Sequence, residues 1–154
     1  MATLYSDIPV GSGRATYPVT EYGGGVVNAA WGGYSFTADP APADVLYLFY
    51  LPACKVLDGA VRGVRLDTDA SATFDFDIGV PSDTDAFGNF GVVGGAAVSG
   101  VKPEAQIWMP LNGLLKNGPY ALTEKTPVIL TVNDDTATFA AGAVWVHMFY
   151  ACGK

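Results

Sequence analysis

The sequence predicts an all-β protein, an antiparallel β-sandwich of jelly-roll type preceded by an irregular N-terminal arm. Two observations lead to this class. Many short apolar segments are separated by turn-forming residues, among them 19 glycines and 10 prolines in 154 residues, and no segment has a convincing helical period. The run 44–80 also contains two strand patterns: 45–51 is apolar at every position, whereas 72–80 alternates between apolar and polar residues.

Composition and charge predict a single domain, with 1–25 as the arm and 26–154 as the sandwich. A chain of this length buries roughly 68–70% of its unfolded surface, enough for a core without disulfides or metals. The net charge is −7 and the eight Lys and Arg residues are scattered singly, so we expect no nucleic-acid partner. We see neither a signal peptide nor an apolar stretch of about 20 residues, and therefore expect a cytoplasmic product with no membrane contact.

The arm has little periodicity and ends in three glycines. Its large apolar side chains lie among Gly, Ser, Thr and Pro, and are Tyr5, Ile8, Tyr17 and Tyr22. One interpretation is a poorly ordered terminus. The other is an extended segment that docks on a neighbouring molecule, because four large apolar groups are an unusual choice for a free tail.

The next two segments are predicted strands on either side of a proline-containing loop that excludes helix. Residues 26–37 form a strand that Gly32 and Gly33 interrupt. Residues 45–51 form a strand covered on both faces, since every side chain in it is apolar.

A tight turn is expected at Asp58-Gly59, followed by a short strand from which Arg62 points outward. The alternation in 72–80 then predicts a strand with one face in the core and the other in water.

The middle of the chain is richer in turn signals. Residues 81–91 are predicted to be turns throughout, and 105–109 a short strand. Residues 110–122 are predicted to be a loop with at most one helical turn, at Leu114-Leu115.

Two strong strands, 127–133 and 142–151, close the chain. The last strand is apolar on both faces, with Val144, Val146, Met148 and Tyr150 on one face and Trp145, His147, Phe149 and Ala151 on the second. Either loops or another subunit would cover this second face.

No catalytic constellation accompanies the polar residues. His147 is the single histidine and lies between apolar neighbours without a nucleophile motif, which favours a structural role. We expect Cys54 and Cys152 to be free thiols, because disulfides are rare in proteins that are not exported. The Gly-rich stretches lack nucleotide-binding spacing, so no cofactor is expected.

Alternate or adjacent aspartates, among them Asp67 and Asp69, are the only residues with metal-like spacing. The best loop is 82–88, in which Asp83 and Asp85 are candidate calcium ligands, although we favour solvated turn acids because the later Glu of an EF-hand is absent. Asp75 and Asp77 would serve glycoside hydrolysis only if such carboxylates faced one cleft.

Several motifs follow one another with a recognisable spacing. They are Leu51-Pro52, Val56-Leu57-Asp58, Asp77-Ile78-Gly79, 83–87, Leu130-Thr131-Val132 and 142–150. Their order resembles the small head decoration, or cement, proteins of tailed bacteriophages, whereas the first 25 residues and 88–120 have no counterpart. The resemblance implies a jelly-roll-like sandwich that oligomerises and binds the outside of an icosahedral shell without catalysis.

We therefore expect a virion structural protein on the capsid surface, made in the host cytoplasm, with the major capsid protein and further copies of itself as partners, in a dimer or trimer. The candidate interface residues are Tyr5, Ile8, Tyr17 and Tyr22 in the arm, and Trp145 and Phe149 in the last strand. The alternative is a glycan-binding or host-adhesion module of a fibre, which would use Trp31 or Trp108 with a calcium loop. A small hydrolase, with a carboxylate pair such as Asp75 and Asp77, is a third hypothesis. For Trp31, Trp108 and Trp145 we favour packing in the core or at a subunit interface.

Overall fold

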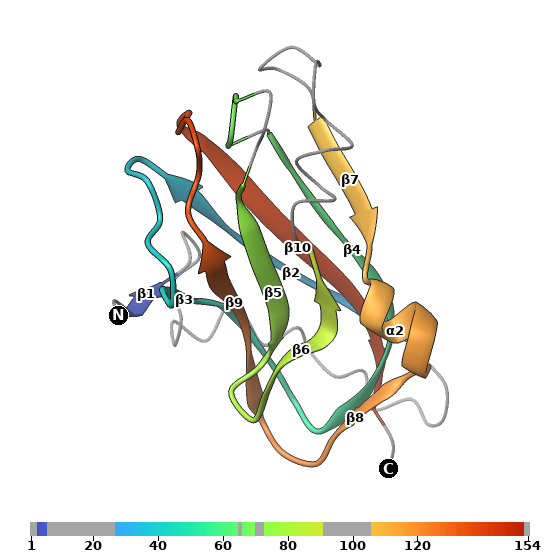
Figure 1. The fold of residues 1–154 in the computed structure, drawn as a ribbon. Helices are drawn as coiled ribbons and strands as arrows, with labels where there is room; N and C mark the ends of the chain where they lie inside the picture. The colour runs from blue at the N-terminus through green and yellow to red at the C-terminus, as the bar shows by residue number, and fades with distance from the viewer. Residues whose placement is uncertain (1–2, 6–26, 65, 70–72, 91–105, 153–154) are drawn as a thin grey trace.

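The computed structural model describes residues 3–5, 27–64, 66–69, 73–90 and 106–152 (Figure 1). Its elements are β1 Thr3–Tyr5, β2 Val27–Phe36, β3 Val45–Leu51, β4 Cys54–Val64, β5 Asp75–Val80, β6 Asp83–Asn89, β7 Gln106–Pro110, α2 Asn112–Asn117, β8 Tyr120–Leu122, β9 Thr126–Asp134 and β10 Gly142–Ala151. Sheet A has the strand order β1-β3-β9-β5-β6, and sheet B the order β2-β10-β4-β7, with β8 paired to β4. The two sheets form a sandwich, which confirms the predicted fold class.

The core lies between the sheets and follows the two-residue period of the strands. In β10, the buried side chains are those of Val144, Val146, Met148 and Tyr150. In β5 and the residue before it, they are those of Phe74, Phe76, Ile78 and Val80. Both alternations predicted from the sequence are therefore confirmed on their core-facing sides.

The strand β3 departs from a simple alternation. Its pairing with β9 shifts register between Tyr47 and Phe49, so Leu48 and Phe49 are both buried although they are neighbours. Its other face carries Tyr47 and Tyr50, which are partly buried, and the Lys125 ammonium lies 5.0 Å from the Tyr50 ring centroid. The prediction of a strand covered on both faces is thus confirmed for the core face, and the second face is partly covered.

The N-terminal arm is partly regular. The strand β1 pairs in parallel with β3, and Tyr5 lies opposite Tyr47 in the register. The other arm residues of interest, Ile8, Tyr17 and Tyr22, lie outside the described residues.

The predicted interruption of the first strand is wrong, because β2 continues through Gly32 and Gly33. A Cβ atom on Gly32 would lie 2.7 Å from Cδ1 of Phe49 on the core side, and one on Gly33 would lie 2.5 Å from the ring of Trp145 on the other side. The two glycines therefore allow aromatic rings to lie directly against both faces of the strand.

The predicted turn at Asp58-Gly59 is also wrong, because both residues lie inside β4. The pairing of β4 with β10 shifts register at Leu57, which is a β-bulge. A Cβ atom on Gly59 would overlap the backbone carbonyl of His147 in β10. Glycine at this position permits the close approach of β4 and β10. In the sequence, an Asp-Gly pair used in this way looks the same as one that forms a turn.

Residues 81–91 contain a strand, contrary to the prediction of turns throughout. Val80 pairs with Asp83, so only Pro81 and Ser82 form the hairpin turn before β6. In β6, Phe87 is fully buried and its ring packs on that of Tyr120, with 5.4 Å between centroids. The outward carboxylates suit an edge strand.

The loop predicted for 110–122 contains the six-residue helix α2 and the strand β8, so it is more regular than expected. Leu114 is buried and Leu115 exposed, and α2 packs against β6. Within the described ranges, no helix is long and apolar enough to cross a membrane.

Candidate functional site

The outer face of sheet B is the most distinctive surface of the described chain. The pairing of β10 with β2 and β4 places side chains in three rows across the sheet. The rows are Ala29, Phe149 and Asp58; then Trp31, His147 and Ala60; then Gly33, Trp145 and Arg62. We call this set the sheet-B face. It brings together residues that lie more than 100 positions apart in the chain.

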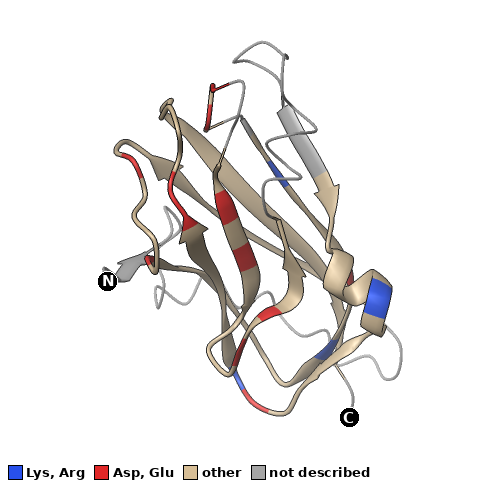
Figure 2. Ribbon diagram, viewed as in Figure 1, with Lys and Arg blue, Asp and Glu red and all other residues tan. Residues whose placement is uncertain are grey.

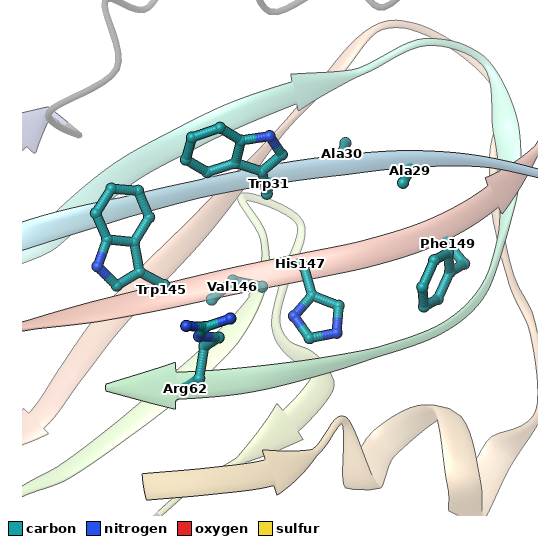
Figure 3. Close-up of a pocket in the computed structure, with 8 residues that line it drawn as sticks. All are labelled: Ala29, Ala30, Trp31, Arg62, Trp145, Val146, His147 and Phe149. Carbon is teal, nitrogen blue, oxygen red and sulfur yellow. The ribbon is translucent and has the colours of Figure 1, made fainter. Parts of the chain in front are cut away.

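The sheet-B face exposes large apolar side chains. Trp31 is 50% exposed, Phe149 41% and Val27, at the start of β2, 54%. Between them lies a shallow hollow of about 530 Å³, lined by Trp31, Trp145, His147, Phe149 and Arg62 with neighbouring alanines (Figure 3). Apolar groups gathered in this way on one surface are typical of an interaction site.

The aromatic side chains hold one another in place. The rings of Trp31 and Trp145 lie 5.5 Å apart at an interplanar angle of 40°. Those of His147 and Phe149 are 5.9 Å apart in an edge-to-face arrangement. Because Gly33 has no side chain, the Trp145 ring lies directly against β2 at this position.

Two opposite charges flank the hollow on β4. Burial lowers the pKa of His147, the Arg62 guanidinium lowers it further, and Asp58 opposes both. The imidazole is therefore neutral at neutral pH, since the net pKa lies below its ordinary value. The face then carries one negative charge, at Asp58, and one positive charge, at Arg62, on either side of an uncharged centre, and the exposed Lys55 adds a positive charge on the same side of β4, next to Ala151.

This face contains two of the predicted interface residues, Trp145 and Phe149. Trp31 joins them, and Arg62 points outward as expected. Asp58 was missed, because its pairing with glycine suggested a turn. Tyr5 lies in sheet A, and Trp108 lies in β7, opposite Arg62 in the register.

The candidate calcium ligands Asp83 and Asp85 lie on the edge strand β6 and not in a loop. Burial raises the pKa of Asp83, and the hydrogen bond and negative charge of Asp85 raise it further. In the described part of the chain, no group of three or more His, Cys, Asp or Glu side chains is placed to hold a metal ion. The calcium hypothesis thus loses the loop geometry on which it was based.

The other carboxylate pair, Asp75 and Asp77 on β5, is held by amides. Asn89 Nδ2 donates to Oδ1 of Asp77 at 2.7 Å and to Oδ1 of Asp75 at 3.3 Å. Asn133 Nδ2 also donates to Asp75, at 3.2 Å. Asp77 is only 9% exposed, so the predicted water-facing side of this strand is partly covered.

Acidic residues are more widespread than basic ones over the described chain (Figure 2). One of them, the buried Asp67, joins its own segment to the loop after β9 by hydrogen bonds. It is 4% exposed and accepts five backbone N–H hydrogen bonds. Oδ1 accepts from Asp69 at 3.1 Å and Thr138 at 3.2 Å, and Oδ2 from Thr73 at 2.8 Å, Phe74 at 3.3 Å and Ala137 at 2.9 Å. Sequence reasoning grouped this residue with the solvated turn acids.

Both cysteines are free thiols in the structure. Burial raises the pKa of Cys54 to about 12, with a further contribution from the nearby Cys152. Burial also raises the pKa of Cys152.

The fold is similar to chains of bacteriophage capsid structures. A chain of the cyanophage Pam1 capsid asymmetric unit is 25% identical, with a TM-score of 0.64 over 88% of this chain and 91% of that one. A chain of the capsid of Ralstonia phage GP4 is 22% identical, with a TM-score of 0.69 over 99% of both chains. A chain of the acidic stable capsid of Helicobacter pylori bacteriophage KHP30 is 15% identical, with a TM-score of 0.57 over 84% and 90%.

Comparison with protein-family models finds no match. Comparison with curated proteins finds none either. The likeness to these three phage capsid chains is one of fold, over 84–99% of this chain.

Proposed function

We propose that this chain is a structural protein of a bacteriophage virion, which decorates the capsid surface and stabilises the shell by bridging neighbouring capsomers. The observation that carries the proposal is the likeness, over 88% of this chain at 25% identity, to a chain of the Pam1 capsid. The proposed partner of this chain is the major capsid protein, and the proposed activity is binding without catalysis.

The surface supports this role. The sheet-B face offers apolar contact area, and charged residues are only 15% of the chain. A protein that binds only the assembled lattice stabilises it by mass action. Repeated copies on a shell make individually weak contacts sufficient.

The arm aromatics are proposed to add shell contacts. Tyr5, Ile8, Tyr17 and Tyr22 are the residues concerned. Removing residues 1–25 should weaken binding to shells, and an unchanged affinity would exclude the arm from the interface.

Electron cryo-microscopy of particles that contain this chain tests the proposal directly. We expect density of its size on the outer surface, over the junctions between capsomers. Shells without the chain should break at a lower temperature or lower denaturant concentration than shells with it. Density absent from the outer surface, or equal stability of the two kinds of shell, would refute the bridging role.

A glycan-binding module remains the second candidate, because Trp31 and Trp145 line the hollow. Aromatic rings are suited to stack on sugars as well as on proteins. A glycan array with and without a chelator separates the two functions. Specific binding that Trp31→Ala abolishes would favour the module, and no binding would favour the capsid role.

A further inference from the structure

We infer that Cys54 and Cys152 are a reversible redox pair, which closes to a disulfide within one chain when the protein meets an oxidising medium. The structure describes the open form, in which both residues are thiols. The inference goes beyond the proposed function, because it concerns a covalent change in the chain itself. It rests on the register between two strands of sheet B and on the face of the sheet that the two side chains share.

The pairing of β4 with β10 brings the two cysteines opposite each other. In this antiparallel ladder Tyr150 pairs with Val56, and Ala151 pairs with Lys55. One step further along the same ladder, Cys152 stands opposite Cys54. Directly opposite residues in an antiparallel pair have Cα atoms about 4.5 or 5.5 Å apart, and disulfides span Cα distances of about 4.4–6.8 Å. The register therefore gives a separation that a disulfide can bridge without rearrangement of the sheet.

Both cysteine side chains lie on the core side of sheet B. Side chains alternate between the two faces of a strand, and Tyr150 and Val56, two positions from the cysteines, are both buried. Cys54 is 6% exposed, and Cys152 is half-buried and packs against the same hydrophobic core. Lys55, between Cys54 and Val56, is exposed on the opposite face. The two thiols therefore form a cross-strand pair on one face of the sheet.

The electrostatic effect of one thiol on the other agrees with this placement. Burial, and to a smaller extent the negative charge of Cys152, raise the pKa of Cys54 to about 12. An interaction between charges weakens with distance, so this effect requires the two sulfur atoms to be near each other. The sequence has two cysteines, so no other thiol of the chain competes for either of them.

The reaction balances with glutathione disulfide as the oxidant. The thiolate of Cys152, the more exposed residue, attacks one sulfur of glutathione disulfide, forms a mixed disulfide and releases one glutathione. The thiolate of Cys54 then attacks the Cys152 sulfur, forms the internal S–S bond and releases the second glutathione. Two protein thiols lose two electrons and two protons, which convert one glutathione disulfide into two thiols. Because the Cys54 thiol is rarely ionised, the second step is the slower one.

Closure joins the end of β10 to the start of β4 and encloses most of the sandwich. The loop between the two cysteines contains about 100 residues and includes every element from β4 to β10. A cross-link across a loop of this length strongly restricts the unfolded chain, so the closed form should be the more stable one. The open form should persist where glutathione keeps thiols reduced, and the closed form in an oxidising medium.

The test uses the full chain in buffers with a graded ratio of glutathione to glutathione disulfide. Wild type should lose about 2 Da, the mass of two hydrogen atoms, and digestion should give one cross-linked peptide that contains both cysteines. The thermal midpoint of the closed form should lie about 5–10 °C above that of the open form. The equilibrium constant for closure should be about a hundredfold larger in the folded chain than in the urea-unfolded chain, because the coupling between folding and closure is reciprocal.

Two variants separate an internal disulfide from other thiol reactions. Cys152→Ser, a change at a half-buried site, should gain neither an internal link nor a thermal shift under oxidation. Cys54→Ala should stop at the mixed disulfide between Cys152 and glutathione. Circular dichroism checks that each variant is folded, and wild type with Cys152→Ser decides the test if Cys54→Ala is not.

A wild-type chain that stops at the mixed disulfide, or that forms disulfides only between chains, would overturn the inference. So would an internal disulfide that forms equally well in the folded and unfolded chain, or one that lowers the thermal midpoint. All of these measurements use the isolated chain without shells, so failure of the redox pair leaves the proposed function intact.

Discussion

Replacing Asp67 by asparagine should lower the free energy of unfolding more than any other single loss of charge in the described chain. An asparagine of almost the same shape has one oxygen acceptor instead of two. In the better orientation its oxygen keeps the three hydrogen bonds that Oδ2 makes, and its NH₂ group then faces the N–H groups of Asp69 and Thr138. Two buried donors left unpaired cost about 1–3 kcal/mol each, hence about 2–6 kcal/mol in total.

The pH dependence follows from the pKa of this carboxyl. Burial alone raises it, but the backbone N–H groups of Ala137, Thr73, Asp69 and Thr138 outweigh burial and hold the net pKa below its ordinary value. A lowered pKa means that the carboxylate stabilises the folded state fully above the unfolded value of about 3.9, and that this contribution is lost as the pH falls through the folded pKa. The difference between wild type and Asp67→Asn should therefore be largest near neutral pH and shrink below about pH 4.

Urea denaturation at a series of pH values measures both quantities. Asp135→Asn is the matched control, because it removes one negative charge from an exposed side chain on the neighbouring loop and should change stability by less than about 0.5 kcal/mol. The reasoning fails if Asp67→Asn lies within about 0.5 kcal/mol of wild type at neutral pH. It also fails if the difference persists unchanged in acid.

Two further predictions concern packing and thiol reactivity. Gly33→Ala should destabilise the fold by about 1–3 kcal/mol, because the new methyl group meets the Trp145 ring and would also lie 2.7 Å from the backbone oxygen of Val144. Thermal melts should show a smaller cost in a Trp145→Ala background, and equal costs would exclude the ring as the obstacle. Iodoacetamide at mildly alkaline pH should modify Cys152 well before Cys54, whose pKa of about 12 keeps it protonated. Peptide mass spectrometry measures the two rates, and equal rates in the folded protein would contradict the assignment.

The strands were largely predictable from local pattern. The alternation in 72–80 and the apolar runs 45–51 and 142–151 depend only on successive side chains pointing to opposite faces. Strand 142–151 was placed with its observed bounds. The division of its side chains between two faces was also predicted, but which face lies in the core was not.

The errors share one cause. Gly32, Gly33 and Gly59 were interpreted as breaks or turns, because glycine is common in both. In the structure each lies inside a long strand, where a neighbouring strand or aromatic ring approaches too closely for a Cβ atom. A single sequence does not distinguish glycine needed for a turn from glycine needed for contact, since the second depends on residues far away in the chain.

Composition and periodicity were sufficient for the all-β class, the core side of the strand 72–80 and the surplus of apolar residues in β10. Only the tertiary structure could decide that Asp67 is buried among five N–H donors, and that Trp31, Trp145 and Phe149 share one face with Asp58 and Arg62. The physical reason is that the alternation of polar and apolar residues along a strand is a local property of the chain. The neighbours of a side chain depend on the register between strands that are distant in sequence.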